Sequence, residues 1–166
     1  IINFVSKRDT IIRSSSISED LYSKSNAGHF ISKKIKKGSP KNKILNAIEE
    51  VSCKLGDYDE IIVQHCILNV SCSGVIFSSD NNTNAPYISI EYDYSGSTDL
   101  VTSGRDRIKE KTIIYKHKIL NNKKFSFIYK IVSILEKMFN SNRVDIEFAI
   151  KKNIFYFLQI RHLPNP

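Results

Sequence analysis

The sequence of 166 residues contains no tryptophan, one methionine, four prolines and six glycines, and no two of the glycines are adjacent. The motifs G-x-x-x-x-G-K-[ST], G-x-G-x-x-G and H-E-x-x-H are all absent. No stretch approaches the roughly 18 uninterrupted apolar residues of a membrane span, and the N-terminus lacks the pattern of a signal peptide. The sequence therefore gives no sign of a P-loop, a Rossmann fingerprint, a zinc protease or a membrane anchor, and we expect a soluble protein.

Cysteine and histidine are too few and too scattered to predict a metal centre or a disulfide framework. Cys53, Cys66 and Cys72 are an odd number at spacings that match no zinc or haem pattern, and the four histidines show no ligand spacing. We therefore expect a reducing, cytoplasmic location.

The length of the chain limits the number of domains. With 41% hydrophobic residues the chain is long enough for one core and short for two ordinary domains, so we expect a single domain. The first residue is Ile1 rather than methionine, and we expect a piece of a longer protein.

The net charge of +8 has two interpretations, a solvated basic face or nucleic-acid binding. Only Lys33 to Lys37 forms a dense basic tract, without interleaved aromatics, so we favour the first and do not expect nucleic acid as a partner.

Two stretches have helical periodicity. After Ser39 as the expected N-cap and Pro40 as the first helical residue, apolar residues follow at helical spacing, and Gly56 is the expected left-handed end. A second amphipathic helix is predicted over residues 125–139.

The remaining apolar runs have the length of strands and are separated by Asn, Ser, Gly and Asp clusters. Strands are predicted at 10–13, 29–32, 61–68, 74–77, 87–92, 112–115, 144–150 and 154–159, the last two joined as a hairpin at 151–153. The expected fold is α+β, a mostly antiparallel sheet with packed helices.

Two clusters carry candidate chemistry. Arg13 ends a strand and precedes consecutive hydroxyls, which suits a polyphosphate site, but taken alone this pattern favours an ordinary serine-rich surface loop. Asp145 and Glu147 share one face of a strand, and Gln159 and Arg161 share one face of its predicted partner. These side chains suit Mg²⁺ beside a phosphate, but taken alone they favour cross-strand pairing on an exposed face.

Six segments in order resemble the ATP-grasp domain shared by phosphoenolpyruvate synthase, pyruvate phosphate dikinase, rifampicin phosphotransferase and a bacterial glutamine kinase. Relatives typically carry V-R-S-S-A-x-x-E-D, S-F-A-G, V-Q-x-M-V, S-G-V-x-F-T, D-I-E-W-A and L-Q-x-R-P. The matching segments here are I-R-S-S-S-I-S-E-D (12–20), S-N-A-G (25–28), V-Q-H-C-I (63–67), S-G-V-I-F-S (73–78), D-I-E-F-A (145–149) and L-Q-I-R-H (158–162). Together they cover nearly the whole chain, and their joint occurrence is far more specific than any one of them.

The resemblance implies an ATP-binding site and a role for each matching position. By position it implies phosphate contacts from Arg13 and Ser32, an adenine hinge at Gln64 to Ile67 with the backbone of Cys66, Mg²⁺ held by Glu147 and Gln159, and Arg161 on the transferring phosphate. Asp145 would support that cluster, and Glu91 would lie near the ribose. The residues from the early strand and the closing hairpin would thus meet around one magnesium-bound triphosphate.

The resemblance also implies the reaction. Relatives transfer phosphate from ATP to a histidine on a swivelling domain of the same polypeptide, and from there to a small-molecule acceptor. The family's Gly-Gly-Lys segment, its phosphorylatable histidine segment and its acceptor domain are not found here, so we expect this piece alone to be inactive. Two alternatives stay open: a kinase for a small metabolite such as the amide of glutamine, and a degenerate, non-catalytic ATP-grasp module.

Overall fold

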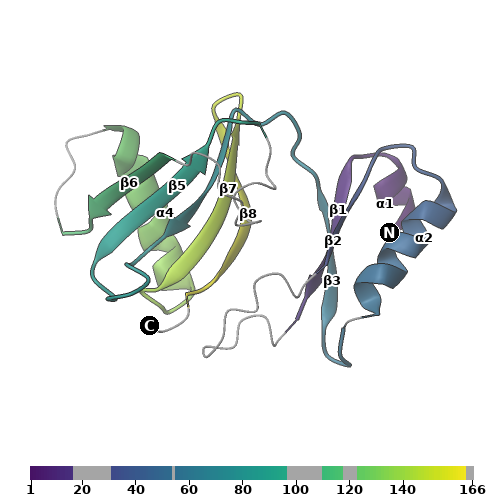
Figure 1. Ribbon diagram of the computed structural model, residues 1–166, viewed down its shortest axis with the longest axis horizontal. Helices are drawn as coiled ribbons and strands as arrows, with labels where there is room; N and C mark the ends of the chain where they lie inside the picture. Colours follow the sequence, from purple (N-terminus) through teal and green to yellow (C-terminus); the bar gives the residue numbers. More distant parts are fainter. Residues whose placement is uncertain (17–30, 54, 97–109, 118–122, 164–166) are drawn as a thin grey trace. The chain divides into compact units, whose positions relative to one another are not determined.

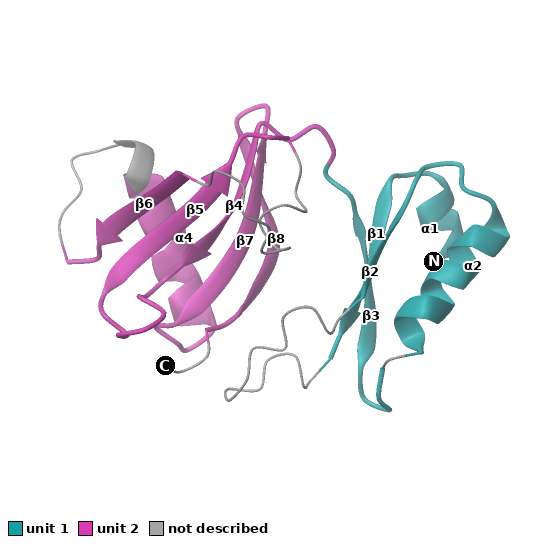
Figure 2. Ribbon diagram, viewed as in Figure 1, with its two compact units in different colours: residues 1–67 teal, residues 68–166 magenta. Residues whose placement is uncertain are grey.

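The computed structural model describes residues 1–16, 31–53, 55–96, 110–117 and 123–163 (Figure 1). The chain forms two compact units, Ile1–Ile67 and Leu68–Pro166, which Figure 2 distinguishes by colour. We call them the N-terminal and the C-terminal unit, and each has its own sheet and its own core.

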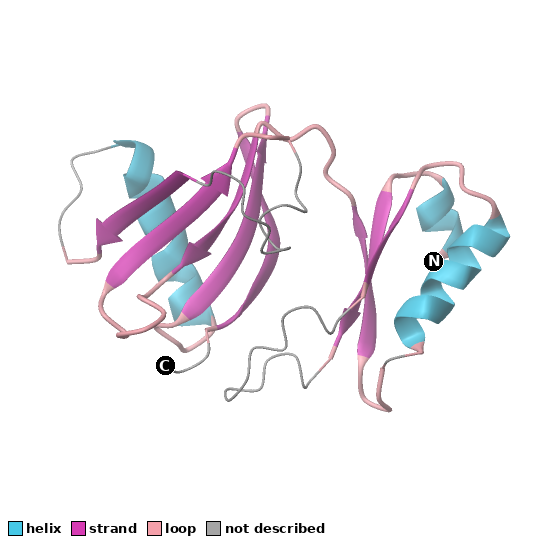
Figure 3. Cartoon of the chain, in the orientation of Figure 1, coloured by secondary structure: helices cyan, strands magenta, loops and turns pink. Residues whose placement is uncertain are grey.

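The N-terminal unit is a three-stranded antiparallel sheet covered on one face by helices (Figure 3). Its elements are α1 (Ile2–Ser6), β1 (Thr10–Ser15), β2 (Ser32–Ile35), α2 (Lys41–Ser52) and β3 (Glu60–His65), with the strand order β2-β1-β3. Every second residue of β1 is buried, because alternate side chains of a strand point to opposite faces. Its core consists of Val5, Ile12, Ile35, Ile44, Ala47 and Val51.

The C-terminal unit is a five-stranded antiparallel sheet with one long helix. Its elements are β4 (Cys72–Phe77), β5 (Tyr87–Asp93), β6 (Glu110–Tyr115), α4 (Lys123–Met138), β7 (Val144–Lys151) and β8 (Ile154–His162), with the strand order β6-β5-β4-β7-β8. Helix α4 packs on one face of the sheet through Val132, Ile128 and Leu135 (Figure 1). The core below it contains Cys72, Ile76, Ile88, Ile90, Ile114, Val144, Ile146 and Phe148.

The α+β class and the antiparallel strands are confirmed, but the strands form two sheets where one was expected. The hairpin is also confirmed, since β7 pairs with β8 around Lys152 and Asn153, both of which have positive φ. The more specific prediction, a single ATP-grasp domain over residues 1–166, stays a prediction.

Several expected boundaries were wrong. Pro40, not Ser39, is the N-cap of α2, and no side chain caps that end. The helix ends at Ser52 with a right-handed Cys53, so Gly56 does not terminate it; the Gly56 N–H instead donates to Asp59 Oδ2 at 2.9 Å.

Strand β2 lies three residues later than the predicted 29–32, of which residues 29 and 30 fall outside the described ranges, and α1 was not predicted. The serines after Arg13, for which a surface loop was one interpretation, begin inside β1, and residues 17–26 that follow them are likewise not described. In the described part of the chain, no helix has both the length and the apolar character to cross a bilayer.

Candidate functional site

The sheet face opposite α4 in the C-terminal unit carries most of the polar side chains of the candidate site, and we call it the polar face. On β7, Val144, Ile146 and Phe148 point into the core, so Asp145 and Glu147 between them point the other way. The alternating apolar residues that build the core therefore fix which side chains this face presents.

Glu147 and Gln159 lie directly opposite each other across β7 and β8. Directly opposed residues in an antiparallel pair place their Cβ atoms about 4.5–5.5 Å apart on the same face. A register shift follows at once, between Glu147 and Phe148, where β8 contains one extra residue, Leu158. The two proposed metal ligands are thus register partners across the hairpin, and their role toward a metal stays a prediction.

Asp145 and Arg161 are the next opposed pair, and they form an ion pair in which Arg161 Nε donates to Asp145 Oδ2 at 2.8 Å. The Asp145 side chain is only 5% exposed, whereas that of Arg161 is 30% exposed. Burial raises the pKa of the Asp145 carboxyl, and the charge and hydrogen bond of Arg161 oppose that rise. The second oxygen, Asp145 Oδ1, is buried and accepts no hydrogen bond from the described residues.

These residues fit a magnesium ion with few protein ligands. Mg²⁺ prefers oxygen ligands and is commonly held by one or two carboxylates, with water and substrate phosphates completing its shell. Glu147 offers a carboxylate and Gln159 an amide oxygen, and the unpartnered Asp145 Oδ1 belongs to the neighbouring pair on the same face. Within the described ranges no group of three or more His, Cys, Asp or Glu residues could hold a metal ion.

The polar face also contains Glu91, which the resemblance placed near a ribose, and Lys111, which was not predicted. The Glu147–Gln159 row continues across the sheet through Val75 of β4 and Glu91 of β5 to Lys111 of β6. Glu91, weakly predicted near a ribose, accepts a hydrogen bond from Lys111 Nζ at 3.1 Å. Alternation with the buried Ile88 and Ile90 is a local signal for the outward side of Glu91, whereas nothing local in the sequence indicates Lys111.

In the N-terminal unit, three predicted residues share the sheet face opposite α2. Arg13 of β1 lies opposite Ser32 of β2, and Ile11 of β1 lies opposite Gln64 of β3, so Arg13, Ser32 and Gln64 are on one face. Of the described residues, none forms an ion pair with the half-buried Arg13 guanidinium. This face therefore presents a cation beside a hydroxyl and an amide.

The predicted hinge residues Cys66 and Ile67 follow β3 at the end of the N-terminal unit. Cys66 is buried, and its backbone N–H donates to the Asp9 carbonyl at 2.8 Å. That amide is already engaged, so a contact between this segment and a base requires other atoms or the loss of this bond. The adenine role of Cys66 stays a prediction, and the hydrogen bond to Asp9 argues against a base contact from the Cys66 N–H.

The predicted residues fall in both units: Arg13, Ser32, Gln64, Cys66 and Ile67 in the N-terminal unit, and Glu147, Gln159 and Arg161 in the C-terminal unit. Their roles toward a nucleotide stay predictions. Comparison of the chain with protein-family models and with curated proteins finds no match. The family resemblance therefore depends on the six sequence segments. The positions of the side chains on each sheet face do not depend on that resemblance.

Proposed function

We propose that this chain is the nucleotide-binding domain of an ATP-dependent phosphotransferase related to phosphoenolpyruvate synthase and pyruvate phosphate dikinase. In this proposal the phosphoryl group passes from ATP to a histidine on a swivelling domain of the same polypeptide, and then to a small-molecule acceptor. The observation that carries the proposal is the pairing of Glu147 with Gln159, next to the Asp145–Arg161 ion pair on the same face. Two oxygen ligands beside a positioned cation suit a metal-bound phosphate.

Each side chain of the polar face has a definite role in this proposal. Glu147 and Gln159 hold Mg²⁺, which when bound neutralises charge on the phosphates. Arg161 contacts the transferring phosphoryl group, and its bond to the buried Asp145 restricts the guanidinium to a narrow set of orientations. Phosphoryl transfer depends on such positioning and charge stabilisation more than on covalent participation by the protein.

The N-terminal unit contributes its own set of groups. Arg13 supplies a guanidinium that can bind a phosphate in a bidentate manner, with the Ser32 hydroxyl opposite it in the neighbouring strand. Gln64 to Ile67 are proposed for the base. Because the expected phosphate-binding lysine has no counterpart in this sequence, we expect the chain alone to bind ATP weakly.

Weak binding calls for an assay that locates the metal as well as the nucleotide. We propose to titrate the 166-residue chain with ATP and a trace of Mn²⁺ in place of Mg²⁺, and to record NMR signals of the backbone amides. The paramagnetic ion broadens signals close to it, so amides around Glu147 and Gln159 should broaden first. Glu147→Gln should abolish this effect, since it removes the charged metal ligand.

A matched control is Glu110→Gln, the same change at an exposed position at the start of β6. It should leave the broadening around β7 and β8 unchanged. Broadening that is centred elsewhere, or that persists in Glu147→Gln, would refute the proposal. No response to nucleotide and metal would favour the non-catalytic module, and a strongly salt-dependent response to nucleic acid would favour the basic-face alternative.

A further inference from the structure

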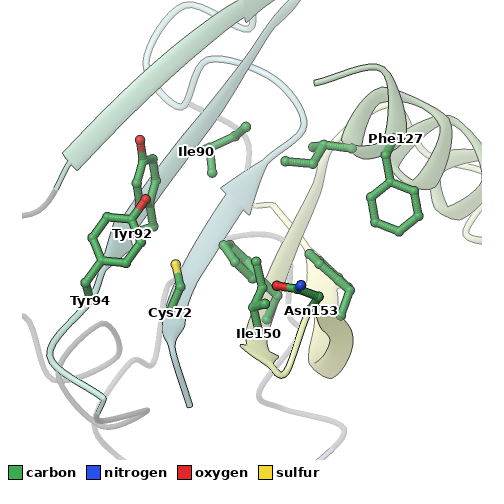
Figure 4. Close-up of a pocket in the computed structure, with 10 residues that line it drawn as sticks. Cys72, Ile90, Tyr92, Tyr94, Phe127, Ile150 and Asn153 are labelled. Carbon is green, nitrogen blue, oxygen red and sulfur yellow. The ribbon is translucent and has the colours of Figure 1, made fainter. Parts of the chain in front are cut away.

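A cavity of about 280 Å³ lies in the C-terminal unit, between the core face of the sheet and the first turns of α4 (Figure 4). Cys72, Ile90 and Phe148, all nearly inaccessible to solvent, form its floor. Tyr94 and Phe127, which are 58% and 53% exposed, lie at its mouth. The cavity therefore opens to solvent beside these two rings and reaches down to the core.

Two small residues on β4 explain why the core is hollow at this point. A Cβ atom at Gly74 would lie 2.7 Å from the ring of Phe148, so this ring occupies the place of the missing side chain. The same ring stacks on Phe155, with centroids 5.0 Å apart and planes at 10°. Cys72, the next β4 residue on this face, has a short side chain opposite Ile150. The space above Cys72 is consequently left between aromatic walls.

The chemistry of the lining selects the kind of occupant. Five of the ten lining residues are aromatic, and none is charged. The polar groups are few: the Cys72 thiol, the Asn153 amide and two tyrosine hydroxyls, of which that of Tyr92 lies 3.5 Å from Thr112 Oγ1. A charged ligand would lose its hydration here without gaining a counter-ion. A flat neutral ring can pack edge-to-face or offset against the aromatic walls.

We propose that this cavity is a binding site for a small neutral aromatic molecule of one or two rings. An apolar cavity of about 150 Å³ is enough to hold benzene. The larger volume here accommodates a second ring, with Asn153 and Tyr94 available to hydrogen-bond a single polar group. Figure 4 shows the Cys72 and Ile90 side chains between the two tyrosines on one side and Ile150 with Asn153 on the other.

This site is separate from the polar face and does not depend on the proposed function. Cys72, Ile90 and Phe148 all belong to the core under α4, whereas Glu147 and Glu91 point to the opposite side of the sheet. A ligand in the cavity would therefore leave the polar face unobstructed.

Indole is a suitable probe, because it is a neutral bicyclic molecule with one N–H donor. Titration of the full chain should give saturable binding with a dissociation constant on the order of 0.1–1 mM, as expected for about nine non-hydrogen atoms. Cys72→Leu fills the hollow and should weaken binding at least about tenfold. Cys53→Leu makes the same change at an exposed cysteine of the N-terminal unit, outside every proposed site, and should leave binding unchanged. Absent binding, or binding retained in Cys72→Leu, would overturn the proposal.

A second measurement needs no substitution, in case Cys72→Leu does not fold. N-ethylmaleimide is added to the natural chain with and without indole, and the modified cysteines are identified by mass spectrometry. Indole should slow modification of Cys72 and leave that of the exposed Cys53 unchanged. Equal rates at Cys72 in both samples would overturn the proposal, as would a Cys72 that never reacts, because an open cavity must admit the reagent.

Discussion

Replacing Arg161 by alanine removes the counter-ion of a buried carboxylate. The Asp145 side chain is 5% exposed and its Oδ2 atom accepts the hydrogen bond from Arg161 Nε at 2.8 Å. Removing one partner of a buried ion pair usually costs about 3–5 kcal/mol, because the remaining charge stays desolvated. The Arg161 side chain is 30% exposed, so water can enter the space it leaves and recover part of that cost. We therefore expect Arg161→Ala to lower the free energy of unfolding by about 2–3 kcal/mol at neutral pH.

The sign of the pH dependence follows from the same carboxyl. Burial raises the pKa of Asp145 above its ordinary value of 3.8, and Arg161 opposes the rise, so the pKa rises further when Arg161 is absent. Between 3.8 and the raised pKa the folded state then binds a proton that the unfolded state has lost. Stability in this window falls as the pH rises. The deficit of Arg161→Ala should therefore be largest at neutral pH and shrink toward pH 3.8.

The assay is urea unfolding of the full chain, with hydrogen exchange of β7 and β8 amides to assign the loss to the C-terminal unit. The matched variant is Asp145→Asn/Arg161→Ala, which removes the buried charge as well and should recover most of the lost stability. A loss below about 0.5 kcal/mol for Arg161→Ala at neutral pH would show that the pair is effectively solvated. An equal loss at acid and neutral pH, or no recovery in the double variant, would refute the role of the Asp145 charge.

Two further substitutions test packing and hydrogen bonding in the same unit. Gly74→Ala should destabilise the chain by about 1–3 kcal/mol in urea unfolding, because the new Cβ would lie 2.4 Å from a backbone carbonyl oxygen of β5. The control is Gly56→Ala, where the nearest atom is 3.6 Å from the new Cβ. Equal losses of stability in the two variants would contradict the argument. Ser78→Ala should cost about 1–3 kcal/mol, because it removes the buried hydroxyl that accepts the Val144 N–H at 2.8 Å. Ser71→Ala removes an exposed hydroxyl bonded to a carbonyl and should have a smaller effect; the reverse order would count against the explanation.

Local patterns in the sequence were sufficient for most of the secondary structure. The apolar spacing of residues 44–55 and 125–139 corresponds to α2 and α4, and the alternation in 144–150 and 154–159 corresponds to β7 and β8. Helix and strand periodicity is a property of neighbouring residues, so it can be recognised without knowing the fold. The same alternation placed Asp145 and Glu147 on one face before any partner strand was known.

The boundaries that were missed depend on contacts made elsewhere in the chain. Lys33 and Lys34 belong to the basic tract after the predicted strand 29–32, yet they lie within β2, because pairing with Ile12 and Ile11 of β1 outweighs their low strand propensity. Ser39 is a better N-cap residue than Pro40, but the helix begins one residue later and its cap makes no side-chain hydrogen bond. Helix α1 has five residues, too few to show a periodic pattern.

For this protein the sequence by itself determined the α+β class, the two longer helices and the sides of the strands on which the acidic residues lie. Only the tertiary structure decided that the strands divide into two sheets, that Glu147 faces Gln159, and that Asp145 is buried against Arg161. It alone also placed the ring of Phe148 over Gly74 beside an open cavity. The physical reason is that strand register, burial and cavities arise from contacts between residues far apart in the chain, whereas helix and strand patterns arise from residues next to one another.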